Sequence, residues 1–324
     1  MGRVRCAADA GAVDPPPPAH VKIFLAGGTG VVGMRLVPLL ASAGHSITAI
    51  GRTPEKRAAL SRYGAKPVEV SVFDADRLRQ AVAGHDVVIN LTTAIPPASK
   101  ALIPGAWKPT ARIRTTGSAN LADAARTGGA TRYIQESFAP IYEDAGDKWI
   151  DERSPVRPVR YNRAVLDAEH AAQAFTANGR EGIVLRFAFF YGPDSDFLHS
   201  MIANVRRGWA PNFGPDGFVS SISHDDAASA VVAALNVPEG IYNVTDNEPV
   251  TKREFFRALA ASVGAPEPRF PPAWISYLLG SLGETLARSQ RMSNRKLRTA
   301  SAWAPKFPSV REGLAEAIAK RRRT

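Results

Sequence analysis

An apolar run that leads into three regularly spaced glycines constrains this chain more than any other feature. Residues 21–26 are almost continuously apolar, as in strands that a parallel sheet buries on both faces. Gly27, Gly30 and Gly33 follow at G-x-x-G-x-x-G spacing, and a helical pattern over about residues 31–43 opens directly behind them. Gly27 permits a tight turn, Gly30 lets a ligand approach the backbone, and Gly33 lets the helix pack close to the strand. The sequence therefore predicts a strand–turn–helix unit whose helix N-terminus favours a bound phosphate.

A second predicted strand, Ser46–Ile50, follows this helix after Gly44 and completes a βαβ unit. The strand ends at Gly51-Arg52-Thr53, and no acidic residue precedes Glu55. In dinucleotide-binding βαβ units an acidic residue at this place binds the 2′-hydroxyl of the adenosine ribose, whereas an arginine accommodates a 2′-phosphate. Arg52 therefore favours NADP(H) over NAD(H), although NAD is possible. The alternative is that Arg52 is an ordinary solvated loop cation.

Strand and helix patterns go on alternating as far as about residue 190. The predicted strands cover residues 67–70, 86–91, 132–136 and 182–187, and the predicted helices cover 76–83, 111–126 and 161–177. Such alternation predicts an α/β fold, a Rossmann-type doubly wound parallel sheet, with ligands outside the carboxyl ends of its strands. Beyond residue 191 the pattern becomes mostly helical, which predicts a smaller C-terminal substrate lobe.

We therefore expect three regions in the chain. Residues 1–19, which end in a proline run, are expected to form a disordered leader. Residues 20–190 are expected to form the core of the NAD(P)-binding domain. Residues 191–324 are expected to be mainly substrate-binding, with segments that return to the core.

Composition narrows the class of protein further. Cys6 is the only cysteine, so no intramolecular disulfide can form, and we expect a cytoplasmic protein. No apolar run is long enough to span a bilayer, and no metal-ligand spacing of His or Cys is present. The formal net charge is +11, but no nucleic-acid-binding motif accompanies the basic residues. We therefore expect the partner to be a small-molecule substrate. The sequence leaves the oligomeric state open.

Further motifs along the chain are specific in combination. They are Gly27-Gly28-Thr29-Gly30-Val31-Val32-Gly33, Phe73-Asp74-Ala75, Asp86-Val87-Val88-Ile89-Asn90-Leu91, Phe190-Tyr191-Gly192-Pro193, Ser223-His224-Asp225-Asp226 and Tyr242-Asn243-Val244. With Tyr161 at the start of a predicted helix, they make the chain from Val21 to about Leu314 resemble the extended, atypical short-chain dehydrogenase/reductases of the NAD-dependent epimerase/dehydratase family.

This resemblance implies where a cofactor binds. The residue that matches Asp74 contacts the adenine in that family, and the segment that matches Leu91-Thr92-Thr93 runs beneath the adenosine ribose and the pyrophosphate. With Arg52 added, the expected cofactor-binding residues are Gly27, Thr29, Gly30, Val31, Val32, Gly33, Arg52, Phe73, Asp74, Leu91, Thr92 and Thr93.

The resemblance breaks where the family places its catalytic groups. The family lysine that lies four residues after the tyrosine is replaced by Val165. Bringing a tyrosine pKa from ~10 towards neutrality takes on the order of 4 kcal/mol, and valine supplies none of it. Phe138 stands where the family has a serine or threonine, and Ser137 is displaced from that position by one residue. Tyr161, as a neutral hydrogen-bond donor, and Ser137 remain the catalytic candidates.

Arg114 stands where the family has an asparagine. It could bind a substrate carboxylate or phosphate in bidentate fashion, or form a structural ion pair with Asp151 or Glu152.

Three hypotheses follow. The first is an NADP(H)-dependent enzyme, oxidoreductase or epimerase/dehydratase-like, that acts on a cytoplasmic small molecule with a non-standard catalytic set. The second is a redox-neutral enzyme on the same scaffold that catalyses epimerisation, elimination or cyclisation. The third is an NADP(H)-binding sensor or scaffold without catalysis.

Overall fold

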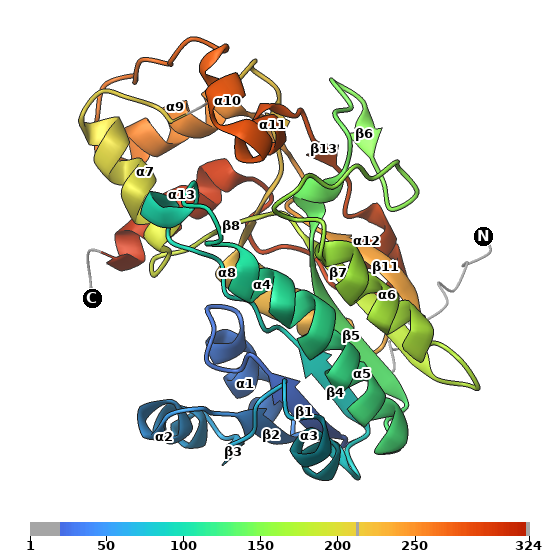
Figure 1. Cartoon of the computed structure of the whole chain (residues 1–324). Helices are drawn as coiled ribbons and strands as arrows, with labels where there is room; N and C mark the ends of the chain where they lie inside the picture. Colours follow the sequence, from blue (N-terminus) through green and yellow to red (C-terminus); the bar gives the residue numbers. More distant parts are fainter. Residues whose placement is uncertain (1–19, 212–213, 322–324) are drawn as a thin grey trace, which may run out of the picture.

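A seven-stranded, wholly parallel sheet runs through the centre of the computed structural model, which describes residues 20–211 and 214–321 (Figure 1). Its strand order is β11-β7-β5-β4-β1-β2-β3, so the direction of winding reverses between β1 and β4. The predicted Rossmann-type doubly wound sheet is thereby confirmed. The carboxyl ends of β1 and β4 flank this reversal, which is where such sheets bind ligands. The leader predicted for residues 1–19 lies outside the described residues.

The strands of the central sheet are β1 (Lys22–Ala26), β2 (Ser46–Ile50), β3 (Lys66–Val68), β4 (Val87–Asn90), β5 (Arg132–Phe138), β7 (Glu181–Phe187) and β11 (Gly240–Val244). The helices associated with them are α1 (Gly33–Ser42), α2 (Pro54–Arg62), α3 (Ala75–Val82), α4 (Lys108–Arg112), α5 (Ser118–Thr127), α6 (Val165–Phe175) and α8 (His224–Ala233).

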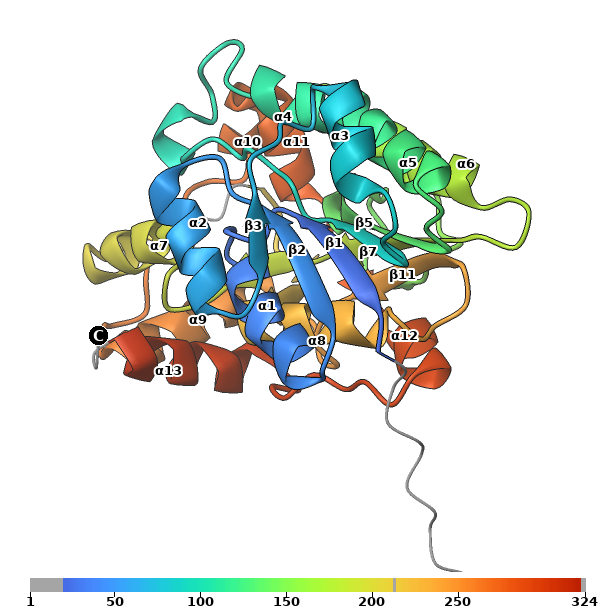
Figure 2. The same ribbon diagram turned by 90° about the horizontal axis from the view of Figure 1, so that it is seen from below.

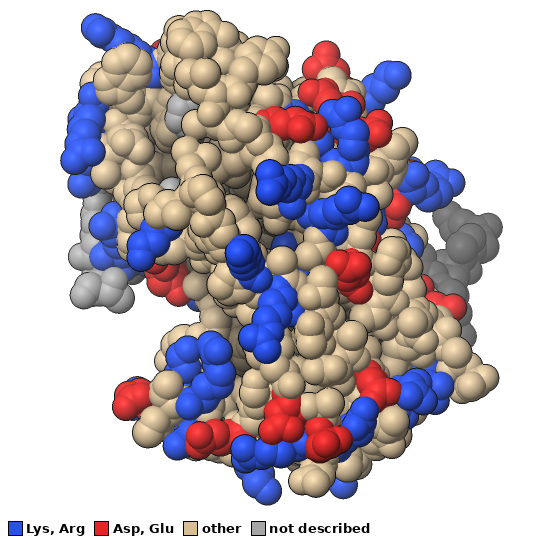
Figure 3. Space-filling model, in the orientation of Figure 1, with Lys and Arg blue, Asp and Glu red and all other residues tan. Residues whose placement is uncertain are grey.

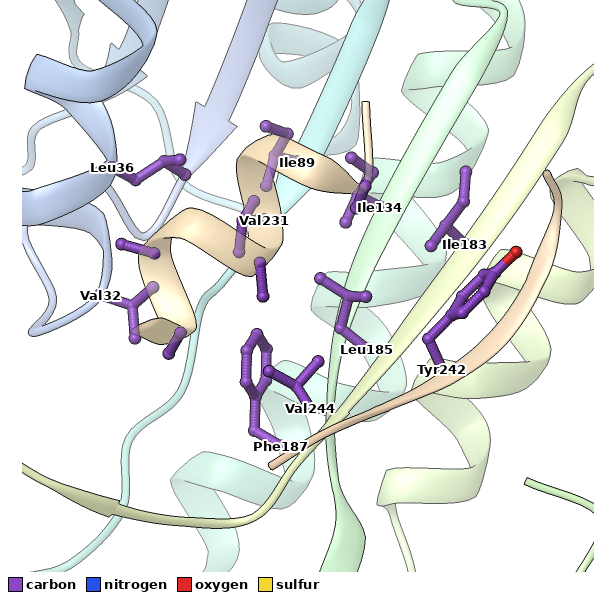
Figure 4. Packing of buried hydrophobic residues seen from close by; sticks show 14 of the residues in the cluster. Val32, Leu36, Ile89, Ile134, Ile183, Leu185, Phe187, Val231, Tyr242 and Val244 are labelled. Carbon is purple, nitrogen blue, oxygen red and sulfur yellow. The ribbon is translucent and has the colours of Figure 1, made fainter. Parts of the chain in front are cut away.

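Helices cover both faces of the sheet, because alternate strand residues point to opposite sides (Figure 2). On one face α1 and α8 bury the side of β1 that carries Ile23 and Leu25. Figure 4 shows this layer, where Val231 of α8 packs among strand residues such as Ile89. On the other face α3, α5 and α6 bury the side that carries Phe24. Each fully buried aliphatic side chain of this kind contributes about 1.5–3 kcal/mol.

The C-terminal lobe has a core of its own, formed by α7, α9 and α13. Its helices are α7 (Asp196–Arg206), α9 (Lys252–Val263), α10 (Ile275–Leu278), α11 (Gly280–Ala287), α12 (Arg295–Ala300) and α13 (Val310–Arg321). The remaining short strands are β6 (Trp149–Ile150), β8 (Phe189–Tyr191), β9 (Phe218–Val219), β10 (Ser221–Ser223), β12 (Val250–Thr251) and β13 (Arg291–Met292). Both α8 and β11 return from this half of the chain to the central sheet.

Two predicted helices differ from the observed ones. The helix predicted over 161–177 begins only at Val165, because residues 160–164 form a turn. The Asn162 side chain accepts a hydrogen bond from the Val159 N–H at 2.7 Å, and the Val165 N–H bonds back to the Asn162 carbonyl at 3.0 Å, three residues earlier. Such i→i+3 bonds wind the chain more tightly than an α-helix.

The helix predicted over 111–126 is interrupted by a π-helical turn, Ile113–Gly117, between α4 and α5. Single π-turns inside α-helices are frequent at functional sites. In the part of the chain that the structure describes, no helix is both long and apolar enough to cross a membrane.

Candidate active site

The turn after β1 has no room for a side chain at two of its glycines. Gly27 has a φ of +91°, and a Cβ there would lie 2.6 Å from the carbonyl of Leu91. A Cβ on Gly33 would lie 2.3 Å from the Gly27 carbonyl oxygen. The first glycine is required by backbone conformation and the second by close packing, so β1, α1 and the end of β4 meet tightly here.

The N-terminus of α1 presents unbonded N–H groups at this turn. The N–H of Gly30 donates to the Gly27 carbonyl at 3.0 Å, but those of Val31, Val32 and Gly33 have no acceptor among the described residues. Gly30 and Val31 are exposed, and Thr29 is half-buried. Free N–H groups combined with the helix dipole bind phosphate, so this cradle fits the pyrophosphate of a dinucleotide.

The segment after β4 lies beside the same turn. The Leu91 N–H donates to the Ala26 carbonyl at 2.9 Å. The Thr92 N–H and hydroxyl both donate to the Asn90 side-chain oxygen, at 3.1 and 2.5 Å. Thr93, the next residue, is exposed. The predicted Leu91-Thr92-Thr93 segment is thus held next to the phosphate cradle by the buried amide of Asn90.

Arg52 stands at the end of β2 with an exposed side chain. In the described part of the chain it has neither a hydrogen bond nor an ion pair, unlike nearby Arg57, which bonds to Glu69 at 2.7 Å. The Arg52 guanidinium is therefore available to an external anion.

Asp74 caps α3, since one of its carboxylate oxygens accepts a hydrogen bond from the Arg77 N–H at 3.2 Å. The ring of neighbouring Phe73 packs against the Arg112 guanidinium, 4.1 Å from its carbon to the ring centre. Phe73 and Asp74 both lie at the start of α3, which follows the carboxyl end of β3 in the parallel sheet.

Tyr161 lies half-buried in the turn before α6, and its ring packs on that of Trp107 with centroids 4.5 Å apart. Burial raises the pKa of Tyr161, while the Thr285 hydroxyl and the charges of Arg114 and Arg288 oppose the rise. The phenol is therefore neutral at physiological pH and can donate a hydrogen bond.

Neither position that follows Tyr161 by one turn carries a cation. Val165 is fully buried. Residues 160–164 form a turn with i→i+3 bonds, in which residues three apart lie on the same side. That residue for Tyr161 is Ala164, which is apolar as well.

Ser137 is fully buried near the end of β5, and its hydroxyl donates a hydrogen bond to Glu169 on α6. The same carboxylate forms a bidentate ion pair with Arg186 of β7, at 2.8 and 2.7 Å. Arg186 also donates to the Tyr142 hydroxyl at 2.9 Å. The Ser137 hydroxyl thus belongs to a buried network that ties β5, α6 and β7 together, and its catalytic role stays a prediction.

Arg114 forms a buried ion pair, but with a different partner from those expected. Its Nη2 atom lies 3.1 Å from Glu136 Oε1, and both side chains are buried. The expected partners are engaged elsewhere, Asp151 with Arg153 at 3.0 Å and Glu152 with the Asn243 N–H at 2.8 Å.

Sequence reasoning missed Glu136, the partner of Arg114, and also Arg288, whose charge acts on Tyr161. Glu136 directly precedes Ser137 in β5. Its place near the end of a strand is the sequence feature that could have marked it as a site residue. Arg288 opens a basic run without acids up to Arg311, and nothing in the run distinguishes it. In the structure Arg288 is buried and donates to the Tyr142 carbonyl at 3.0 Å.

A groove of about 410 Å³ opens to solvent beside Tyr161, between α4 and α6. Arg160 and Arg163 line it, and so does the carboxylate of Asp167. Figure 3 shows Lys and Arg side chains gathered on this face of the molecule. The two arginines outnumber the one carboxylate, so the groove lining is positive overall.

Comparison with known proteins decides the family. The family model for the NAD dependent epimerase/dehydratase family matches residues 23–245, from β1 to the turn after β11. The chain belongs to this family. The chemistry of the cradle, with free N–H groups at a helix N-terminus, fits the pyrophosphate of a nicotinamide dinucleotide.

Relatives within the family are named as reductases, dehydrogenases and epimerases. A 3-diazoavenalumate denitrifying reductase of Streptomyces is 31% identical over 310 residues, which cover 91% of this chain and 99% of the relative. A Stigmatella aurantiaca ketoreductase of 4-hydroxy-2-methyl-3-oxo-4-farnesyl-3,4-dihydroquinoline-1-oxide is 26% identical over 281 residues, 83% of this chain and 81% of the relative. The chain is therefore an NAD(P)-dependent enzyme of the oxidoreductase or epimerase class.

Solved structures share the fold at lower identity. The human epimerase family protein SDR39U1 with NADPH superimposes with a TM-score of 0.77 at 20% identity, covering 92% of this chain and 99% of that one. MoeE5 with UDP-glucuronic acid and NAD has a TM-score of 0.76 at 22% identity, with 93% and 99% covered. Nicotinamide cofactors of both kinds thus occur on this epimerase/dehydratase fold.

Proposed function

We propose that this epimerase/dehydratase-family enzyme is an NADP(H)-dependent reductase of a small molecule in the cytoplasm. It reduces an electrophile that needs no tyrosinate–lysine pair to transfer a proton. The observation that carries the proposal is the buried Val165 in the lysine position, in a chain that keeps the dinucleotide cradle. The chain has kept the means to hold a cofactor and lacks the cation that would ionise Tyr161.

The substrate class follows from that missing cation. When bound, a reduced nicotinamide supplies a hydride. A ketone that accepts hydride becomes an alkoxide and needs a proton, whereas an aromatic diazonium does not. In the diazonium the carbon gains a C–H bond and loses its C–N bond, and dinitrogen leaves with the electron pair of that bond. The 31% identical Streptomyces relative is named for a diazo substrate, which supports this class.

The chain's own residues then have positioning roles. Neutral Tyr161 donates a hydrogen bond to the substrate, and its packing on Trp107 holds the phenol in place. The Phe138 ring at the end of β5, 6.1 Å from that of Phe189, is proposed to give the site an apolar wall. Ser137 is proposed to act indirectly, by holding Glu169 in the middle of α6.

The preference for NADP(H) rests on Arg52. Its guanidinium stands at the end of β2 without an internal partner, which suits a 2′-phosphate. The residues proposed to hold the rest of the dinucleotide are those of the glycine turn, together with Phe73, Asp74 and the segment 91–93.

The experiment compares two electrophiles that share a benzoate ring, 4-diazoniobenzoate and the ketone 4-acetylbenzoate. The purified enzyme is incubated with each and with NADPH, and the loss of nicotinamide absorbance is measured against enzyme-free mixtures. We expect enzyme-dependent oxidation of NADPH with the diazonium only, with benzoate as the product in mass spectrometry. Equal or faster turnover of the ketone would contradict the proposed substrate class.

The same experiment separates the redox-neutral alternative. Product formation from either compound without net loss of NADPH would show epimerase-type or elimination chemistry and would overturn the reductase proposal.

A further inference from the structure

The groove beside Tyr161 is separate from the dinucleotide cradle. Its lining comes from α4 and from residues 160–170, whereas the residues expected to bind the cofactor follow the strands β1 to β4. At about 410 Å³ the groove has the volume of a small-molecule site, for which about 300–1,000 Å³ is typical. A small molecule can therefore occupy it while a cofactor occupies the cradle.

Small side chains leave this space open between the two helices. Ala111 of α4 and Ala164 of the turn before α6 both line the groove and are both half-buried. Because an alanine side chain is a single methyl group, these two positions leave room that longer side chains would fill. Leu166, also half-buried, adds a larger apolar side chain to the lining. Part of the groove thus suits the apolar body of a ligand.

Arg160 and Arg163 supply the charge of the groove. The two residues are three apart in a turn held by i→i+3 bonds, which places them on the same side. Both side chains are exposed, and neither has a hydrogen bond or an ion pair within the residues that the structure describes. Arg153, a few residues earlier, is instead paired with Asp151 at 3.0 Å. The two guanidiniums of the groove are therefore available to an external anion.

The carboxylate in the lining does not neutralise these arginines. Asp167 follows Arg163 by four residues, a spacing at which helical ion pairs form, but the described contacts include no bond between the two side chains. With the basic residue nearer the helix N-terminus, the order of the two charges is the less favourable one for such a pair. Two guanidiniums against one carboxylate leave the lining with a surplus positive charge, which complements an anionic ligand.

We propose that this groove binds a small organic oxyanion, a carboxylate or a phosphate ester on an apolar body. The guanidiniums of Arg160 and Arg163 bind the oxygens, because their planar forks of N–H donors match both head groups. Leu166 and the two alanines contact the apolar body, and the ligand also lies against Tyr161. The site goes beyond the proposed reduction, since it uses none of the cofactor-binding residues and does not depend on hydride transfer.

The test is a binding measurement with three compounds that share a naphthalene body: 2-naphthoate, 2-naphthyl phosphate and the uncharged 2-naphthamide. Ligand-observed NMR titrations use the full chain, with and without saturating NADP⁺. We expect at least one of the anions to bind at least about tenfold more tightly than the amide in both conditions, and the tighter anion identifies the head group. Equal binding of all three compounds would overturn the proposal. Anion binding that NADP⁺ abolishes would place the anion in the cradle and would also overturn it.

Two variants of the lining distinguish the groove from other sites on the surface. The double substitution Arg160→Gln and Arg163→Gln should weaken binding of the tighter anion at least about tenfold and keep that of the amide within about twofold. Asp167→Asn removes the opposing carboxylate and should instead tighten anion binding about two- to fivefold. Unchanged anion binding in the double variant, or weaker binding in Asp167→Asn, would show that the anion is held elsewhere.

The double substitution Arg206→Gln and Arg207→Gln is the matched control, because it removes two exposed arginines at the end of α7. It should leave all three affinities unchanged, and melting curves verify that every variant is folded. Repeating the titrations at a tenfold higher protein concentration tests a second copy of the chain as the occupant. Anion affinity that falls as the chain self-associates would assign the groove to that second copy and overturn the proposal.

Discussion

At the scale of single residues, Arg52 is the proposed determinant of the choice between the two nicotinamide cofactors. Its guanidinium is exposed and has no partner within the described residues, so a 2′-phosphate would displace only water from it. A hydrogen bond between charged groups contributes about 1.5–3 kcal/mol, which corresponds to roughly tenfold to hundredfold in affinity.

We therefore expect Arg52→Asp to weaken NADPH binding by at least tenfold and to change NADH binding far less. Thermal-shift titration with both cofactors measures this, because a ligand stabilises the folded state by mass action. Arg62→Asp is the matched control, since it makes the same charge change at the far end of α2. An unchanged preference for NADPH in Arg52→Asp would assign the 2′-phosphate to other residues.

The second prediction at this scale concerns the pH dependence of the reaction. Burial raises the pKa of Tyr161 above its ordinary value of ~10, so the phenol stays protonated throughout the range from about pH 6 to about pH 9. The part of kcat that depends on Tyr161 should therefore be constant over this range. Tyr161→Phe keeps the packing on Trp107, and we expect it to lower kcat by less than about tenfold. A rise of kcat with an apparent pKa near ~7 that Tyr161→Phe abolishes would instead indicate an ionised tyrosine.

At the scale of elements, the Glu169 network joins β5, α6 and β7 beneath the site. Glu169→Ala would leave Arg186 buried without its charge partner, which costs about 3–5 kcal/mol. Ser137→Ala keeps that ion pair and removes one hydrogen bond, which costs about 1 kcal/mol.

Chemical denaturation of the two variants should reproduce this difference in the free energy of unfolding. With Ser137 in a positioning role, Ser137→Ala should also keep kcat within about tenfold of the wild type. A loss of kcat above hundredfold, in a variant as stable as expected, would show that the Ser137 hydroxyl acts on the substrate directly.

The central sheet could be predicted from sequence because its strands are continuous apolar runs between turn residues. Ser46–Ile50, for example, was located to the residue. The start of α6 could not be predicted in this way, because it depends on the side chain of Asn162 bonding to its own turn. Apolar periodicity carries no information about such a bond.

The catalytic region was only partly predictable for the same physical reason. The absence of the lysine could be read directly at Val165. The partners of Arg114 and Ser137, which are Glu136 and Glu169, depend on how β5, α6 and the π-turn before α5 pack in three dimensions. Spacing along the chain does not determine such contacts.

At the scale of the whole molecule, one charged cluster ties the lobe to the cofactor-binding half. Arg35, in the first turn of α1, binds Asp194 with two bonds of 3.0 Å and Asp225 with one of 2.6 Å. The ring of His224 bonds to Asp194 at 3.0 Å. Because α1 also forms the proposed phosphate cradle, this cluster fixes the lobe relative to that cradle.

Despite partial burial, hydrogen bonds from His224 and Arg35 hold the pKa of Asp194 well below its ordinary value. The stability it contributes is thus fully present above about pH 4 and is lost as the pH falls further, towards the lowered pKa. Asp194 is half exposed, so after screening by solvent we expect Asp194→Asn to cost about 1 kcal/mol at neutral pH.

Melting temperatures of Asp194→Asn and the wild type, measured from neutral to acidic pH, check this. The variant should melt roughly 1–3 °C lower at neutral pH, and the difference should vanish in acid. Asp147→Asn, at an exposed loop position, is the control and should follow the wild type. A difference that persists or grows in acid would show that Asp194 is not the ionised member of the cluster.

The most direct test of the account follows a label from the reduced cofactor to the substrate. NADPH carrying deuterium at the transferable position of the nicotinamide is mixed with 4-diazoniobenzoate and the enzyme in a single turnover, and the benzoate is analysed by mass spectrometry. Hydride transfer without a tyrosinate–lysine pair predicts one deuterium on the ring carbon that bore nitrogen, in both the wild type and Tyr161→Phe. Benzoate without deuterium, or a Tyr161→Phe enzyme that transfers none, would contradict it.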